Sequence, residues 1–93
     1  MNARLYLMIL GADVDRAMVI RFLDERESVR HWFYSMPNSV FFSSTESANE
    51  IRDALFDRLG SHRLFISEVS RENRAGRMPT SHWQKVSMIE TGH

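Results

Sequence analysis

The alternation of apolar and polar positions is clearest in the middle of the chain. Residues 40–42, Val-Phe-Phe, form a β-branched and aromatic run that predicts a strand. Ser47 and Glu50 stand at the spacing of a capping box, in which the two side chains satisfy free amide groups at a helix start. Apolar residues then recur at helical spacing as far as Gly60, a residue typical of helix ends. Because residues 64–66 are again apolar, the stretch predicts strand, helix and strand.

The N-terminal half shows the same succession. Residues 4–10 are apolar on both faces and too few for a helix of ordinary length, which favours a strand that is covered on both sides or central in a sheet. Asp13 or Asp15 can then cap a helix of about a dozen residues with one apolar face. Residues 29–34 predict a second strand. A tight turn at residues 36–38, Met-Pro-Asn, joins it to the third strand as a hairpin.

The order strand-helix-strand-strand-helix-strand predicts the fold class. It is typical of an α+β ferredoxin-like sandwich, in which two helices cover one face of a four-stranded antiparallel sheet. The first and third strands are central in that arrangement, and they are the two most apolar strands of this sequence. We therefore predict that residues 1–93 form a single ferredoxin-like domain.

The C-terminal part of the chain leaves two structures open. Residues 71–78 are polar and basic and predict a loop. Beyond it, Trp83, Val86 and Ile89 fit one face of a short helix, and a fifth strand is the competing interpretation.

Length and composition set limits on the class of protein. Ninety-three residues with 43% apolar positions suffice for one domain with a core. No stretch approaches the roughly 18 apolar residues of a membrane span, and no secretion signal is recognisable, so we expect a cytoplasmic protein without a membrane partner. The absence of cysteine excludes disulfides and thiolate metal sites. A net charge of zero excludes a strongly basic nucleic-acid binder.

Basic residues nevertheless gather near the C-terminus. Arg71, Arg74, Arg77 and Lys85 face only Glu72 as a counter-charge in that region. Because the planar fork of arginine suits phosphate recognition, these four residues are the candidate contacts to RNA or DNA. Genome composition can also produce such a preference for arginine.

Carboxylates follow the first predicted strand directly. Asp13 and Asp15 could hold Mg²⁺ or Mn²⁺ beside a phosphodiester, which makes Asp13 the candidate catalytic and metal-binding residue. Helix capping explains the same two residues equally well. The four histidines lack the spacing of a zinc site.

Several segments together resemble a known protein family. They are residues 31–34 (His-Trp-Phe-Tyr), 39–42 (Ser-Val-Phe-Phe), 47–55, 64–69 and 75–83, the last with a Gly-x-x-Pro…Trp ending. With these segments the chain resembles the short bacterial proteins called SinR-like. Those are similar to the small CRISPR-associated adaptation subunit and to virulence-associated protein D, a superfamily of ferredoxin-like homodimers.

The resemblance implies a homodimer with facing sheets that is either a metal-dependent nuclease or a non-catalytic scaffold for nucleic acid. Catalytic members carry an aromatic-Asp pair at the end of the first strand. Here that position holds Leu10 and Gly11, and the nearest carboxylate is Asp13. We therefore expect a non-catalytic scaffold or nucleic-acid-associated interaction protein, with an endoribonuclease or endodeoxyribonuclease as the alternative.

The sheet face without helices is the expected dimer interface. It is apolar enough to need a partner, and a second copy of the chain would supply one. Depending on strand register, we expect Tyr6, Trp32, Tyr34 and Phe41 to contribute to it.

Overall fold

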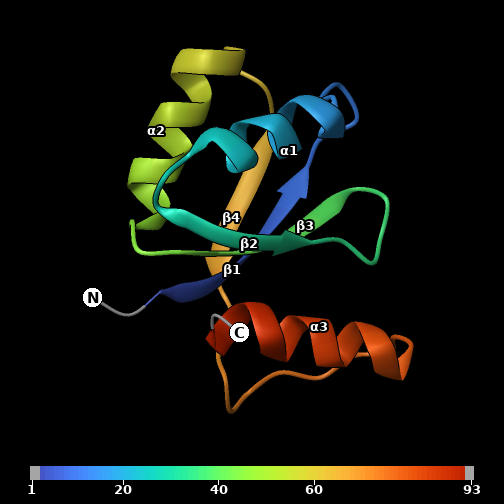
Figure 1. Ribbon diagram of the computed structural model, residues 1–93. Coiled ribbons are helices and arrows are strands. Elements are labelled where there is room, and N and C mark those ends of the chain that lie inside the picture. The colour runs from blue at the N-terminus through green and yellow to red at the C-terminus, as the bar shows by residue number, and fades with distance from the viewer. Residues whose placement is uncertain (1–2, 92–93) are drawn as a thin grey trace.

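A four-stranded sheet forms the centre of the molecule, and helices pack on both of its faces. The computed structural model describes residues 3–91. In chain order the elements are β1 (Arg4–Leu10), α1 (Arg16–Glu25), β2 (Val29–Phe33), β3 (Ser39–Ser44), α2 (Ala48–Leu59), β4 (Leu64–Glu68) and α3 (Thr80–Thr91). Helices α1 and α2 lie on one side of the sheet and α3 lies on the other (Figure 1).

The sheet confirms the predicted α+β class. Its strand order is β2-β3-β1-β4, every neighbouring pair is antiparallel, and the two most apolar strands, β1 and β3, are central. This arrangement is consistent with a ferredoxin-like sandwich. Tyr6 stands opposite Phe42 and Met8 opposite Val40, which aligns the apolar side chains of the central strands on one face.

The main core lies between the sheet and the first two helices. The even-numbered positions of β1 face this side, because successive side chains of a strand point to opposite faces. The buried members of the core are Tyr6, Met8, Leu10, Val19, Phe22, Leu23, Val40, Phe42, Ile51 and Leu55. The rings of Tyr6 and Phe42 stack in its centre with centroids 5.2 Å apart.

Local signals in the sequence fix the ends of the helices. Asp15, rather than Asp13, caps α1 by accepting a hydrogen bond from the Ala17 amide at 3.0 Å. The predicted capping box at α2 is present: Ser47 accepts from the Glu50 amide at 3.2 Å, and the Glu50 carboxylate accepts from the Ser47 amide at 3.0 Å. Gly60 ends α2 with a φ of +83°, a conformation that favours glycine.

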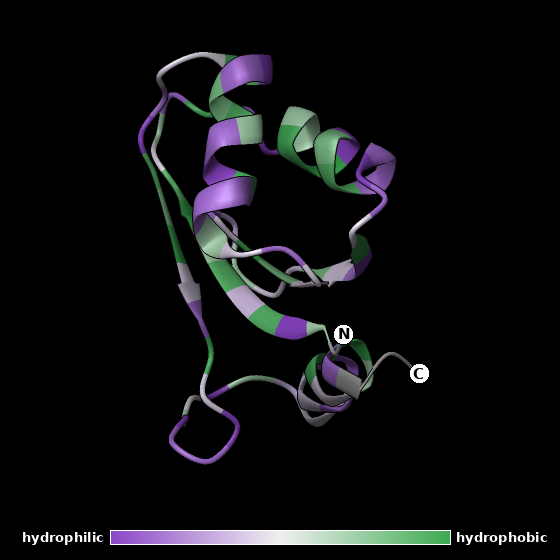
Figure 2. Cartoon of the chain, turned by 90° about the vertical axis from the view of Figure 1, so that its left-hand side faces the viewer, coloured by the Kyte–Doolittle hydropathy of each residue, from purple (hydrophilic) through white to green (hydrophobic). Residues whose placement is uncertain are grey.

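The C-terminal segment is a helix, and it covers the face that the sequence suggested would be free of helices. That expectation is wrong, because the chain leaves β4 through a hydrophilic loop and returns beneath the sheet as α3 (Figure 2). There Val86 and Ile89 are buried against Leu5 and Phe41 in a second apolar cluster. Within residues 3–91, no helix is long and apolar enough to cross a membrane.

Candidate interaction surfaces

Two of the four predicted interface aromatics belong to the interior. Tyr6 is 2% exposed because the register turns it toward α1 and α2, where its hydroxyl donates to the Glu46 carbonyl at 2.7 Å. Phe41 is 8% exposed because α3 covers it. In this chain they fill the two cores, so the expected patch at the surface cannot include them.

The other two aromatics lie together at the β2 edge. Trp32 is half-buried, and its indole N–H donates to the Asp24 carboxylate at 2.6 Å. The rings of Trp32 and Tyr34 are nearly parallel with centroids 6.2 Å apart, and the Arg16 guanidinium lies 3.7 Å from the Tyr34 centroid. This layered stack leaves Tyr34 39% exposed, so it is accessible to a partner.

The face of the sheet on which α3 packs is called the second face here. An apolar pair lies on this face where α3 does not cover it. Ile9 and Phe65 stand directly opposite each other on β1 and β4 and are 48% and 62% exposed. Alternation places Ile9 on the same face as Leu5 and Leu7, which contact the α3 cluster. The sequence does not indicate this pair, because the exposure of Ile9 depends on how far α3 extends over the sheet.

The predicted basic cluster divides into residues with different roles. Arg74 makes a bidentate ion pair with Glu90 of α3: its two terminal guanidinium nitrogens donate to Glu90 Oε2 at 3.1 Å and to Oε1 at 3.0 Å. The Arg74 side chain is 21% exposed. Arg71 also approaches Glu90, with Nε 3.8 Å from Oε1. Glu90 therefore balances one of these charges, and Arg74 holds the loop against α3.

Arg77 and Lys85 are the more available members of that cluster. Both are exposed, and Lys85 Nζ lies 5.1 Å from the centroid of the Phe33 ring. Lys85 thus belongs to the surface along β2, whereas Arg71 and Arg74 share Glu90. The four cations do not all surround one site.

Asp13 pairs with a histidine from the other half of the chain. Its Oδ2 lies 3.2 Å from His62 Nδ1, and the side chains are 60% and 42% exposed, respectively. The hydrogen bond with His62 lowers the pKa of Asp13, and the charge of Arg63 acts in the same direction. The pair can orient the imidazole ring.

The surroundings of Asp13 do not fit a divalent metal. Magnesium and manganese prefer several oxygen ligands, whereas the neighbours of Asp13 are an imidazole and an arginine. Among residues 3–91 no three His, Asp or Glu side chains gather into a group that could hold a metal ion. Of the four histidines, His93 lies outside the described residues.

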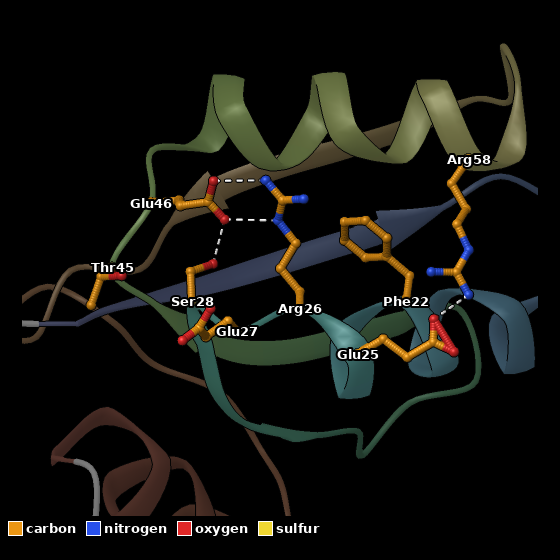
Figure 3. Close-up of a pocket in the computed structure, with 8 residues that line it drawn as sticks. All are labelled: Phe22, Glu25, Arg26, Glu27, Ser28, Thr45, Glu46 and Arg58. Carbon is orange, nitrogen blue, oxygen red and sulfur yellow. Dashed lines mark hydrogen bonds and ion pairs between the residues drawn. The ribbon is translucent and has the colours of Figure 1, made fainter.

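A second polar network surrounds Glu46, between α1 and α2 (Figure 3). Arg26 donates to both Glu46 oxygens at 2.8 Å, and the Ser28 hydroxyl donates to the same carboxylate. The bond from Arg26 lowers the pKa of Glu46; burial opposes this shift and the bond from Ser28 assists it. The sequence gives no sign of this network, because its members are 18 and 20 positions apart.

The Glu46 network forms one end of an open cleft of about 570 Å³. Phe22 lies in the middle of the cleft, and an ion pair between Arg58 and Glu25 forms the other end (Figure 3). Both arginines are thus neutralised by carboxylates. The cleft joins α1 to α2 and offers no uncompensated cation to an anionic ligand.

Comparison with known proteins adds no relative to these observations. No protein-family model, curated protein or solved structure matches this chain.

Proposed function

We propose that this chain is a non-catalytic, cytoplasmic scaffold that forms a homodimer and contacts nucleic acid, as the resemblance to the CRISPR-associated adaptation subunit implies. The observation that carries the proposal is the exposed pair of Ile9 and Phe65 on the second face of the sheet. Two large apolar side chains directly opposite each other on neighbouring strands form a continuous contact surface.

A second copy of the chain is a suitable partner for this pair. A two-fold interface uses the same patch on both copies, so the patch must be compatible with itself. Within β1, β3 and β4, the side chains next to the pair on that face are Leu7, Ser39 and Ser67, which carry no charge. Alternation also places the exposed Arg63, two positions before Phe65, on this face. A symmetric contact must therefore keep the two copies of Arg63 apart at its rim.

The exposed apolar area of the pair is small for a dimer. Burying the exposed halves of two Ile9 and two Phe65 side chains contributes about 3–6 kcal/mol, taking about 1.5–3 kcal/mol for a fully buried side chain. Association costs about 4–15 kcal/mol in lost translational and rotational freedom, so the pair alone does not hold two copies together. We therefore expect neighbouring residues of the same face to add contact area, and a dimer that forms only at high concentration.

Sedimentation equilibrium tests the dimer. The monomer mass is 10.9 kDa, so the proposal expects the apparent mass to approach twice this value as concentration rises. Phe65→Glu should hold the protein at the monomer mass. Phe56→Glu is the matched control, because Phe56 is 40% exposed and belongs to α2, which packs on the opposite face of the sheet (Figure 1). Equal association of all three proteins would remove the pair from the interface.

Contact with nucleic acid is assigned to Arg71 and Arg77, which are exposed on the segment before α3. Lys85 is left out because it belongs to the surface along β2. Arg74 is left out because Glu90 holds its guanidinium. Binding of short RNA and DNA duplexes, measured by fluorescence anisotropy at several salt concentrations, tests this assignment. Replacing Arg71 and Arg77 by Gln should lower the salt slope on duplex DNA by about 1.8, whereas Arg21→Gln should not change it. An unchanged slope in the double variant would refute nucleic-acid contact at these residues.

A metal-dependent endonuclease is the alternative that the resemblance implies, although His62 and Arg63, the neighbours of Asp13, do not supply the oxygen ligands that a divalent metal prefers. Cleavage of RNA and DNA in the presence of Mg²⁺ or Mn²⁺ tests it directly. If Asp13 is catalytic, Asp13→Asn should abolish cleavage without lowering the melting temperature, since Asp15 provides the helix cap. No cleavage by the unaltered protein would exclude this candidate.

A further inference from the structure

A groove of about 530 Å³ follows the outer edge of β2. Its lining comprises Leu23 and Asp24 of α1, all five residues of β2, and Lys85, Met88 and Ile89 of α3. Among residues 3–91, strand β2 pairs only with β3 and therefore lies at an edge of the sheet. Edge strands carry backbone N–H and C=O groups without a neighbouring strand, and these groups can pair with another extended chain.

The walls of the groove stand on opposite faces of the sheet. Trp32 belongs to the core beneath α1 and α2, whereas Phe33 belongs to the cluster beneath α3. An added strand beside β2 would thus direct alternate side chains toward α1 and toward α3. The two helices restrict the position of such a strand on both sides.

Charge selects the kind of segment that fits. Arg30 and Lys85 line the groove against a single carboxylate, Asp24, which already accepts the Trp32 indole N–H. Within residues 3–91 Arg30 and Lys85 make no ion pair. The groove therefore favours acidic side chains and repels basic ones.

The irregular start of β2 limits pairing to its second half. The register shifts between Val29 and His31, which places Arg30 at a bulge. Bulges and charges on an edge strand prevent unselective pairing with other strands. Residues 31–33 remain as the regular segment, and a bound chain must satisfy the charge of Arg30.

From these contacts we infer that the β2 groove binds an extended, acidic segment of a partner protein as an added strand. Apolar side chains of that segment contact Leu23 and Trp32, and acidic ones alternate with them toward Lys85. This inference goes beyond the proposed homodimer and does not depend on it. Ile9 and Phe65 lie on β1 and β4, toward the edge of the sheet opposite β2.

A protein segment suits the groove better than a nucleic acid does. Backbone pairing and apolar walls recognise an extended polypeptide. Nucleic-acid affinity instead depends on many phosphate contacts, and this groove offers two unpaired cations, Arg30 and Lys85.

Amide-shift titration of the full chain with defined peptides tests the inference. The probe is a capped ten-residue peptide of alternating valine and glutamate. One control peptide replaces glutamate by lysine, and the other carries N-methyl groups on alternate backbone amides. We expect the Val-Glu peptide to shift the amides of Val29–Phe33 and of the facing residues of α1 and α3. Both control peptides should bind at least about tenfold more weakly.

Variants of the chain locate the binding site. Lys85→Glu should lower the affinity for the Val-Glu peptide by about tenfold or more and raise the affinity for the Val-Lys peptide. Lys85→Gln should give an intermediate loss of affinity for the Val-Glu peptide. Arg21→Glu makes the same charge change on α1 outside the groove and should leave both affinities unchanged. Phe65→Glu should also leave peptide binding intact, which separates this test from that of the homodimer.

Four results would overturn the inference. Equal binding of the Val-Glu and Val-Lys peptides would exclude charge selection, and equal binding of the N-methylated peptide would exclude strand addition. Shifts of β2 amides that depend on protein concentration alone would assign the groove to a second copy. Larger shifts of the same amides with a short RNA duplex would assign it to nucleic acid.

Discussion

At the residue scale, two neighbouring serines of β3 differ in whether their buried hydroxyl groups have hydrogen-bond partners. Ser43 and Ser44 are both 0% exposed. Ser44 Oγ donates to Ser28 Oγ at 3.0 Å and accepts from the Glu46 amide at 3.1 Å. Ser43 Oγ has no hydrogen-bond partner among the described residues. The two neighbours therefore contribute to stability with opposite signs.

Alanine substitutions at these serines should separate the two contributions. Ser43→Ala removes a buried hydroxyl without a partner and should leave the free energy of unfolding unchanged or raise it by about 1 kcal/mol. Ser44→Ala breaks two hydrogen bonds and should lower it by about 1–2 kcal/mol. Urea unfolding of both variants measures the difference. A larger loss for Ser43→Ala than for Ser44→Ala would contradict these assignments.

The Glu46 carboxylate should make stability depend on pH. Its folded-state pKa is lowered, chiefly by the bond from Arg26. The stabilisation is therefore complete above the unfolded pKa of about 4.3 and is lost as pH falls through the folded pKa. At pH 7, Glu46→Gln should lower the free energy of unfolding by about 1–2 kcal/mol, because the pair is only partly shielded from solvent.

Unfolding measured from pH 7 to pH 3 checks this linkage. The difference between the unaltered protein and Glu46→Gln should shrink as the pH falls below 4.3. Glu72→Gln is the control, because Glu72 is exposed and should affect stability little at any pH. A difference that stays constant over the whole range would show that Glu46 acts without its charge.

Residues that act on their immediate neighbours could be predicted from the sequence, and residues that act across the fold could not. Ser47 and Glu50 are three positions apart, so their capping box was visible as a spacing. Glu46 binds Arg26, Ser28 and Tyr6 through contacts 18 to 40 positions apart. Only the paired strands and the turn after α1 bring these partners together.

At the element scale, α3 depends on a few attachments to the rest of the chain. The ion pair between Arg74 and Glu90 joins it to the preceding loop. His82 lies 2.9 Å from the Ser35 hydroxyl, and its ring meets Phe33 edge-on at 5.0 Å. These contacts orient a helix whose buried apolar residues are Val86 and Ile89 alone among those described.

Breaking the Arg74 pair should loosen α3 selectively. Arg74→Met should lower the free energy of unfolding by about 1–2 kcal/mol and speed amide exchange in α3, since it leaves Glu90 largely covered without its partner. Arg77→Met, the matched control, should have little effect because Arg77 is exposed. Hydrogen exchange with residue resolution measures both variants.

A double-mutant cycle with Glu90→Gln completes this test. If the ion pair carries the effect, adding Glu90→Gln to Arg74→Met should cost less than the sum of the two single changes. Additive losses, or faster exchange in α2 instead of α3, would contradict the assigned role of Arg74.

Periodicity indicated most of the elements, but it did not determine the position of α3. Trp83, Val86 and Ile89 recur at helical spacing, and the structure confirms this interpretation over the competing fifth strand. Which face it covers depends on the path of residues 69–79, which have no periodic pattern. For the same reason the sequence placed Phe41 at an open interface, although α3 covers it.

At the scale of the whole molecule, the two proposed contacts use different sides of one sheet. The apolar pair of Ile9 and Phe65 lies on β1 and β4, and the groove lies along β2 at the opposite edge. A homodimer through the first surface would leave the second accessible in both protomers. Such a dimer could hold two acidic segments at once, as a scaffold requires.

The most direct test of the central claim is an isotope-filtered nuclear Overhauser measurement on a mixture of labelled and unlabelled protein. If the homodimer forms as proposed, cross-peaks should connect Ile9 methyl groups of one protomer with the Phe65 ring of its partner, and Phe65→Glu should abolish them. Cross-peaks between protomers that involve Tyr34 or α3 instead, or none at a concentration at which sedimentation shows a dimer, would contradict this interface.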